Sequence, residues 1–359
     1  MGATVRHSVS IARLLILLAL LVLARAGEAW AGDSVTFEDD VGRQITLPVP
    51  VKRTVVFNRY TTEFIRAIAG MGVVVGDDID PTKEPDYWPT VTRAMVAGQG
   101  QDSPNFEAIV AMRPDVVFFP RNSDWQNATD VLKPFGIPVV VITGWDVLKH
   151  EQNVELLGRL YQQPERAAQL NGFYRHYRDL LAERLKGVVR KRVYLEEKGE
   201  YKTLLKGSGW HDMIESGGGI NVFGDIDILG QPAARGNVQG FDVDPEEILA
   251  RHPDIIIKLA PPQYKPTSRA LSIQVLNAIA ARPGFASLPA VQEGRVYHIG
   301  YFLAAGCSKI IGALQIAKWL YPERFADIDP ADAMRTWLET FQGVPYPGQD
   351  WVSLAELRQ

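Results

Sequence analysis

Apolar positions along this chain follow two spacings, one typical of strands and one typical of helices. Short apolar runs predict strands within residues 53–58, 73–76, 116–119 and 137–143. Between these runs, apolar residues recur at helical spacing in residues 61–70, 106–112 and 125–136. Strands that alternate with helices in this way predict an α/β fold with a mostly parallel sheet covered by helices on both faces.

The pattern begins with a hairpin and continues through one long helix. Two short alternating runs flank Val41 and Gly42 in residues 35–48, which predicts the hairpin. The longest predicted helix spans residues 164–186 and carries apolar residues at helical spacing. After it the alternation resumes, with strands in residues 192–197, 255–259 and 295–300 and helices in residues 209–216, 272–281, 309–320 and 329–343.

This order predicts two α/β lobes joined by one long, rigid helix. The N-terminal lobe would comprise residues 32–163, the linking helix residues 164–186, and the C-terminal lobe with its helical tail residues 187–359. Ligands of open parallel sheets bind beyond the carboxyl ends of the strands. We therefore expect a ligand cleft between the lobes.

A repeated unit supports two related lobes. The stretch "NFEAIVAMRPDVVFFP" starts at Asn105, and "DPEEILARHPDIIIKL" starts at Asp244. Each combines a short helix, a Pro-Asp turn and an apolar run. Glu107 and Glu246 occupy matching positions in the first turn of the two helices. Such an acid stabilises a helix dipole by about 0.3–1 kcal/mol, which explains either one alone but not their recurrence.

The first 31 residues have the features of a cleavable signal peptide. Arg6 and Arg13 precede an apolar run at residues 14–24, which is too short to span a bilayer as a helix. Ala29 and Ala31 supply the small residues that a signal peptidase requires. We expect an exported, periplasmic protein.

Composition narrows the function further. The chain has 359 residues, 46% hydrophobic and 22% charged, and a net charge of -4, so it lacks the basic excess of a nucleic-acid-binding protein. Cys307 is the only cysteine, which excludes a disulfide within the chain and a thiolate metal cluster. We find no metal-binding or catalytic motif, and we predict no metal site, no catalytic residue and no resident cofactor.

The candidate ligand-binding residues are aromatic and cationic side chains that follow predicted strands or lie in nearby loops and helix starts. Arginine forks match carboxylate and oxyanion groups, and aromatic rings supply contact area. The set is Arg59, Tyr60, Trp88, Arg121, Trp125, Trp145, Trp210, Arg235 and Tyr301. Packing in the core is the competing interpretation of each aromatic residue.

Together these segments resemble the periplasmic substrate-binding proteins that serve ABC importers of iron-siderophore complexes, haem and cobalamin. The resemblance covers nearly all of the chain after residue 31, including both repeated units and "GSGWHDMIESGGGINVFGD". It implies a monomeric receptor that docks on an inner-membrane permease dimer through Glu107 and Glu246. It also implies a cleft that includes residues 58–61, residues 98–103 and Tyr301.

The ligand stays open at this stage. Polar, glycine-rich loops precede both repeated units, where the cobalamin-binding relative has aromatic residues, so cobalamin is disfavoured. Haem would need an axial ligand such as Tyr60 or Tyr301. A molybdate or tungstate oxyanion would use the arginines but leave the aromatic residues without a role. A metal chelate, above all a ferric siderophore, fits both. The alternative of another class is a periplasmic enzyme on the same scaffold.

Overall fold

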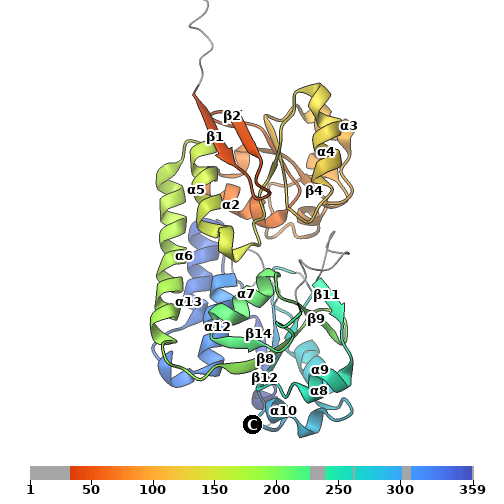
Figure 1. Ribbon diagram of the computed structural model, residues 1–359, viewed down its shortest axis with the longest axis vertical. Helices are drawn as coiled ribbons and strands as arrows, with labels where there is room; N and C mark the ends of the chain where they lie inside the picture. Colours follow the sequence, from red (N-terminus) through yellow and green to blue (C-terminus); the bar gives the residue numbers. More distant parts are fainter. Residues whose placement is uncertain (1–32, 227–238, 262, 301–308, 358–359) are drawn as a thin grey trace, which may run out of the picture.

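The computed structural model describes residues 33–226, 239–261, 263–300 and 309–357, which form two α/β lobes (Figure 1). The N-terminal sheet has the strand order β5-β4-β3-β6-β7, and every neighbouring pair is parallel. Its strands are β3 (Thr54–Val56), β4 (Val74–Asp78), β5 (Val96–Gly98), β6 (Val116–Phe119) and β7 (Val139–Val141). The predicted α/β class is confirmed.

Helices cover both faces of this sheet. One face packs against α3 (Phe106–Met112) and α4 (Trp125–Leu132), and the other packs against α2 (Arg59–Ala69) and α5 (His150–Leu160). Phe118 and Phe119 are neighbours in β6 and belong to the two different apolar clusters. Because neither face meets water, the strands are continuous apolar runs. The sequence pattern did not predict β5 or α5.

The predicted N-terminal hairpin is present. Strand β1 (Ser34–Glu38) pairs antiparallel with β2 (Gln44–Pro48). The turn needs a glycine, because Gly42 has φ of +82°. The carboxylate of Asp39 accepts hydrogen bonds from the backbone N–H groups of Arg43 (2.9 Å) and Val141 (3.1 Å). This carboxylate therefore fastens the hairpin to the end of β7.

The C-terminal sheet is mixed. Strands β10 (Gly219–Asn221), β8 (Lys191–Glu196), β12 (Ile255–Leu259) and β13 (Val296–Ile299) form its parallel centre. Antiparallel strands flank this centre, namely β9 (Lys202–Leu204), β11 (Gln239–Asp242) and β14 (Trp351–Ser353). The α-helices in the described part of this lobe are α7 (Gly209–Ser216), α8 (Pro245–Ala250), α9 (Arg269–Ala280), α10 (Pro289–Gln292), α12 (Lys309–Leu320) and α13 (Pro330–Arg335).

One long helix connects the lobes. Helix α6 (Pro164–Arg184) has 21 residues and runs along both lobes in Figure 1. It begins at a proline, whose fixed φ suits the first helical position, and it ends two residues before the predicted boundary at 186. In the described ranges, no helix has both the length and the apolar character needed to cross a membrane. The proposed signal peptide lies outside these ranges.

A second junction joins the lobes through the C-terminal tail, where α13 continues as a π-helix (Thr336–Phe341) in place of the single α-helix expected there. Arg66 of α2 donates from Nε to Oε1 of Gln342 (2.7 Å) and from Nη1 to the carbonyl oxygen of Tyr87 (2.6 Å). Gln342 in turn donates to the carbonyl oxygen of Glu63 (3.1 Å). The Arg66 guanidinium also lies 4.1 Å from the ring centre of Trp88. We call this set of contacts the clasp.

The fold predicts a pH-dependent stability. His150 at the start of α5 is buried, stacks on Tyr174 of α6 at 3.7 Å between ring centres and meets the ring of Phe64 edge-on. Burial lowers the pKa of His150 to about 3. The folded protein keeps this histidine neutral, whereas the unfolded chain protonates it below its ordinary pKa of about 6.5. Stability should therefore fall as the pH drops from about 6.5 towards 3, by up to about 1.4 kcal/mol per pH unit from this group.

Urea unfolding at pH 7, 5 and 4 measures this slope. His150→Phe keeps an aromatic ring between Tyr174 and Phe64 but cannot bind the proton, so its stability should fall less steeply with acidification. Equal slopes for the variant and the unmodified protein would show that His150 does not titrate in this way.

Candidate ligand-binding site

A cavity of about 370 Å³ opens between the two lobes. Most of its wall comes from the carboxyl ends of β3, β4, β5, β6 and β7, where open α/β sheets bind their ligands. Among the described residues, the turn between β8 and β9 supplies the wall on the C-terminal lobe. The lining residues are Phe57, Asn58, Arg59, Tyr60, Asp78, Asp80, Gln99, Gly100, Gln101, Asp102, Ser103, Asn122, Trp145, Glu197 and Lys198.

The start of α2 places Arg59 and Tyr60 at this cavity. The side chain of Asn58 caps the helix by accepting hydrogen bonds from the N–H groups of Tyr60 (3.2 Å) and Thr61 (3.3 Å). These bonds satisfy backbone donors that the first helical turn leaves without a partner. The strand-to-helix turn therefore fixes where the Arg59 side chain leaves the backbone.

Two buried carboxyl groups lie near Arg59 at the end of β4. Burial and the neighbouring Asp78 raise the pKa of Asp77 well above its usual value, although Thr62 donates a hydrogen bond to it at 2.8 Å. Burial and the charge of Asp80 raise the pKa of Asp78 to about 6. The positive charge of Arg59 opposes both increases. Arg59 therefore serves carboxylates of its own lobe as well as facing the cavity.

The loop at residues 99–103 has little room for larger side chains at its base. A Cβ atom at Gly98 would lie 2.6 Å from the carbonyl oxygen of Ser103, because the chain folds back tightly there. Gln101 donates to the carbonyl oxygen of Asn122 (3.2 Å) and ties the loop to the segment after β6. This close approach gives a physical reason for the glycine-rich sequence that precedes the first repeated unit.

Arg121 contacts groups of the protein itself. Its guanidinium forms an ion pair with Asp146, which is 8% exposed, and lies 4.4 Å from the ring centre of Trp145. It also donates to the carbonyl oxygen of Gly207 in the C-terminal lobe (3.4 Å). Arg121 is absent from the described lining of the cavity. The structure places it in a junction between the lobes, and Trp145 beside it does line the cavity.

The remaining predicted residues fall into two groups. Trp88 and Trp210 are each 1% exposed and pack in the interior, beneath the charges of Arg66 and Lys309. Trp125 begins α4 and packs under Arg43, whose guanidinium carbon lies 4.4 Å from the centre of the Trp125 ring. None of these three tryptophans belongs to the described lining of the cavity, so core packing explains them better. Arg235 and Tyr301 lie outside the described residues.

Sequence reasoning missed several lining residues. Asp78 ends β4 and Asp80 follows it, Asn122 follows β6, and Glu197 and Lys198 follow β8. The search favoured cationic and aromatic side chains, so it passed over acids and amides at the same strand ends. A search of all polar residues after each predicted strand would have found them. Across the described ranges, no group of three or more His, Cys, Asp or Glu residues is placed to hold a metal ion.

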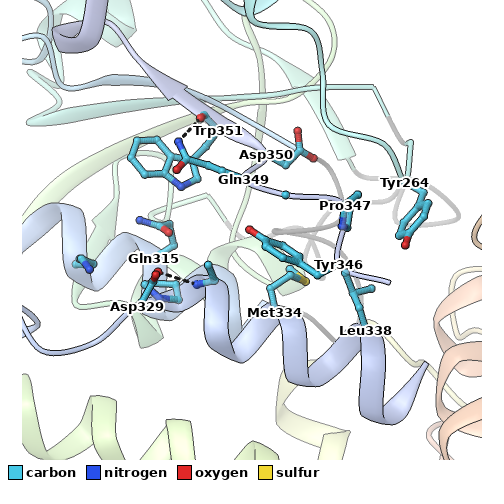
Figure 2. A pocket seen from close by; sticks show the side chains of 14 residues that line it. Tyr264, Gln315, Asp329, Met334, Leu338, Tyr346, Pro347, Gln349, Asp350 and Trp351 are labelled. Atoms are coloured by element: carbon cyan, nitrogen blue, oxygen red, sulfur yellow. Dashed lines mark hydrogen bonds between the residues drawn. The ribbon is translucent and has the colours of Figure 1, made fainter. Parts of the chain in front are cut away.

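A second cavity, of about 120 Å³, lies within the C-terminal lobe (Figure 2). Tyr346, Met334 and Leu338 give it a largely apolar wall. Burial raises the pKa of Asp350 at its rim to about 6, and this carboxylate accepts a hydrogen bond from the N–H of Thr267 (3.1 Å). Its walls come from one lobe, whereas the larger cavity draws residues from both. We therefore take the interlobe cavity as the candidate site.

Comparison with known proteins identifies the family. Residues 61–301 match the profile of the family described as periplasmic binding protein. The chain belongs to this family. A vitamin B12-binding protein of Salmonella typhimurium is 29% identical over 220 residues, which cover 59% of this chain and 75% of the relative. The molybdate-binding protein MolA of Haemophilus influenzae is 25% identical in an alignment that covers 92% of this chain and 97% of the relative.

Solved structures of such binding proteins share the fold. Molybdate-bound MolA of Haemophilus influenzae superposes with a TM-score of 0.70 at 21% identity, covering 87% of this chain and 99% of that one. FepB of Veillonella parvula gives a TM-score of 0.73 at 22% identity, covering 89% of this chain and 99% of that one. The predicted membership of the periplasmic binding protein class is confirmed.

The repeated unit of this periplasmic binding protein recurs in three dimensions. Arg113 (φ 47°) and His252 (φ 44°) both take the left-handed conformation just before the Pro-Asp turn. Asp115 accepts a hydrogen bond from the N–H of Arg53 (2.9 Å), and Asp254 accepts the equivalent bond from Arg192 (2.7 Å). In both lobes, the aspartate thus fastens the strand that follows it to the start of the preceding parallel strand.

The two glutamates occupy equivalent exposed positions. Glu107 lies in the first turn of α3, where Asn105 caps the helix by accepting from the N–H of Ala108 (3.1 Å). Glu246 lies in the first turn of α8, where Asp244 accepts from the N–H of Glu246 (2.8 Å). Each helix therefore has a separate capping residue, and the glutamate carboxylates face solvent.

The Arg121–Asp146 pair gives a stability prediction. Arg121→Ala leaves the buried Asp146 carboxylate without its cation, so we expect a loss of about 3 kcal/mol of unfolding free energy. The double variant with Asp146→Ala should recover part of that loss, because no unpaired charge then stays buried. Urea unfolding of the four proteins in a double-mutant cycle measures the coupling. Additive effects of the two substitutions would show that the pair does not couple energetically.

Proposed function

We propose that this periplasmic binding protein is the solute-binding component of an ABC importer, and that it captures a metal-containing small molecule, in the first place a ferric siderophore. It acts in the periplasm as a monomer and delivers the ligand to an inner-membrane permease dimer. The observation that carries this proposal is the polar cavity between the lobes, to which both lobes contribute charged side chains. The curated relatives named above are binding proteins, which supports a receptor over an enzyme.

The charges around the cavity favour a chelate with both donor and acceptor groups. The described lining contains the cations of Arg59 and Lys198, and also the acids Asp78, Asp80, Asp102 and Glu197. A bare oxyanion in this cavity would be repelled by the carboxylates of the lining when they are ionised. A siderophore carries hydroxyl, amide or amine donors together with anionic groups. It could use both kinds of side chain.

The composition of the cavity argues against cobalamin and haem. A volume of about 370 Å³ lies in the lower part of the range of roughly 300–1,000 Å³ that is typical of small-molecule sites. Phe57, Tyr60 and Trp145 are the aromatic members of its described lining. Cobalamin and haem present wide, flat rings that need a more apolar wall. Tyr60 lines the cavity, so among the described residues it is the candidate axial ligand if the bound molecule is haem.

The second candidate is an oxyanion of the molybdate type. MolA resembles this chain over nearly its whole length, and it binds molybdate. Arg59 would supply charge, and the raised pKa of Asp78 would reduce the repulsion in mildly acidic conditions. The decisive experiment is native mass spectrometry of the protein purified from its own periplasm, followed by titration with sodium molybdate, a ferric catecholate chelate, haemin and cyanocobalamin.

The proposal predicts that Arg59 contributes to affinity. Arg59→Ala should weaken binding of the ferric catecholate chelate by about 2 kcal/mol or more, because a charge-assisted contact in a partly desolvated site is lost. Quenching of tryptophan fluorescence by the coloured chelate measures the affinity. Arg178→Ala, which removes an exposed arginine from α6, is the matched control and should leave affinity unchanged. Unchanged affinity in Arg59→Ala would remove the anionic-ligand argument and favour cobalamin.

The proposal also predicts a docking role for Glu107 and Glu246. Exposed ion pairs with the permease would set register and encounter rate more than affinity, and would be sensitive to salt. Glu107→Ala and Glu246→Ala should therefore leave ligand affinity and the melting temperature nearly unchanged, yet reduce uptake in cells, with the double variant most impaired. Glu155→Ala in α5 is a control for the loss of a carboxylate elsewhere. Normal uptake by the double variant would show that Glu107 and Glu246 stabilise their helices and have no role in docking.

A further inference from the structure

The turn between β8 and β9 is the part of the C-terminal lobe that reaches the described cavity. Glu197 and Lys198 in this turn line the cavity. The turn ends at Tyr201, which has φ of 56°. Residues with large side chains rarely adopt this left-handed conformation, so the surrounding structure must hold the turn in place.

Lys258 in β12 holds the turn in place. Its ammonium group donates to the carbonyl oxygens of three consecutive turn residues, namely Glu197, Lys198 at 3.0 Å and Gly199 at 2.8 Å. An ammonium has three donors and no acceptor, so a ring of carbonyl oxygens suits it. These contacts fix the backbone of the turn and leave the side chains of Glu197 and Lys198 in the wall of the cavity.

A fully buried carboxylate keeps Lys258 in position. Glu196 is 0% exposed, and one of its oxygens lies 2.9 Å from the Lys258 nitrogen. Arg282 donates to both oxygens of Glu196, at 2.7 and 2.9 Å, and the N–H of Tyr201 donates to it at 3.0 Å. Burial alone would raise the pKa of Glu196, but the bonds from Arg282 and the charge of Lys258 lower it. The turn is therefore anchored at both of its ends.

We propose that Lys258 is a positioning residue of the ligand site, which holds the β8–β9 turn in the conformation that brings Glu197 and Lys198 to the interlobe cavity. This inference rests on the proposed function, since it assigns that cavity to the ligand. Lys258 acts on affinity through preorganisation of the turn, which removes an ordering cost from binding. Nothing in its sequence context, the apolar run "IIIKL", marks it as part of a binding site.

The test compares Lys258→Met with Lys191→Met. Lys191 lies at the opposite end of β8 and donates to the carbonyl oxygen of Leu320 at 2.7 Å, so the control also loses a lysine–carbonyl bond. In the ligand-free protein, hydrogen exchange at the amides of residues 197–201 should accelerate in Lys258→Met and stay unchanged in Lys191→Met. A merely structural role would lower stability in both variants without this local change.

Binding kinetics complete the test, with the ferric catecholate chelate and sodium molybdate as probes. If the turn adopts the binding conformation only about a tenth of the time, the apparent affinity of Lys258→Met falls about tenfold. The association rate should carry this loss, while the dissociation rate changes little. Lys198→Ala, which removes a side chain from the cavity wall, should instead raise the dissociation rate.

Unchanged exchange in the turn of Lys258→Met overturns the proposal, as does a normal association rate. If Lys198→Ala weakens binding and Lys258→Met does not, only this inference fails. If both variants bind normally, the turn is not part of the site, and the cavity assignment fails with it.

If neither probe binds the unmodified protein, the proposed ligand classes fail, and the exchange measurement alone decides the role of Lys258. Should Lys258→Met not fold, Lys258→Arg keeps a cation opposite Glu196 but cannot direct its planar donors to one ring of carbonyls.

Discussion

The guanidinium group of Arg66 lies where the two lobes of this protein meet, and the geometry of the cleft depends on it. Arg66 belongs to the N-terminal lobe, yet it donates to Gln342 of the C-terminal tail and lies over Trp88. Arg66 is half-buried, and its charged group bonds to both parts, so these hydrogen bonds hold the tail against the lobe at this point. Phe341 of the same tail lies 5.3 Å from Phe173 of α6 between ring centres. The linking helix, the tail and α2 therefore form one continuous packed junction.

Apart from α6 and the clasp, Arg121 and Asp146 form another junction, in which Arg121 reaches the backbone of Gly207 in the C-terminal lobe. Two kinds of polar group therefore lie around the interlobe cavity. Some stabilise the junction between the lobes, and others line the cavity. Arg121 and Arg59 follow strands of the same sheet, but only Arg59 lines the described cavity. An arginine near a cleft is therefore weak evidence for an anionic ligand until its ion-pair partners are known.

The repeated unit shows how one local solution serves both lobes. In each lobe, a capped helix ends in a left-handed residue, and the Pro-Asp turn fastens the next strand to its parallel neighbour. The same hydrogen bond recurs because each unit leads into a buried parallel strand, and the aspartate satisfies a backbone N–H group at the start of the neighbouring strand. The unit also presents one exposed glutamate on each lobe. The clasp and α6, which join the lobes, thereby also constrain how far apart these two carboxylates lie.

Local spacing and turn chemistry encode the α/β class, the N-terminal hairpin, the long helix and the repeated unit, so all four could be predicted from the sequence. It also indicated that Arg59, Tyr60 and Trp145 lie at carboxyl ends of strands that share one edge. It did not reveal β5, α5 or the mixed edges of the C-terminal sheet, where short segments lack a distinct period. Only the tertiary structure decided that Trp88 and Trp210 are core residues, that Arg121 pairs with Asp146, and that Lys258 lies beneath the β8–β9 turn. These assignments depend on partners distant along the chain, and an aromatic or charged residue has the same local sequence signature whether it faces a ligand or a buried counter-charge.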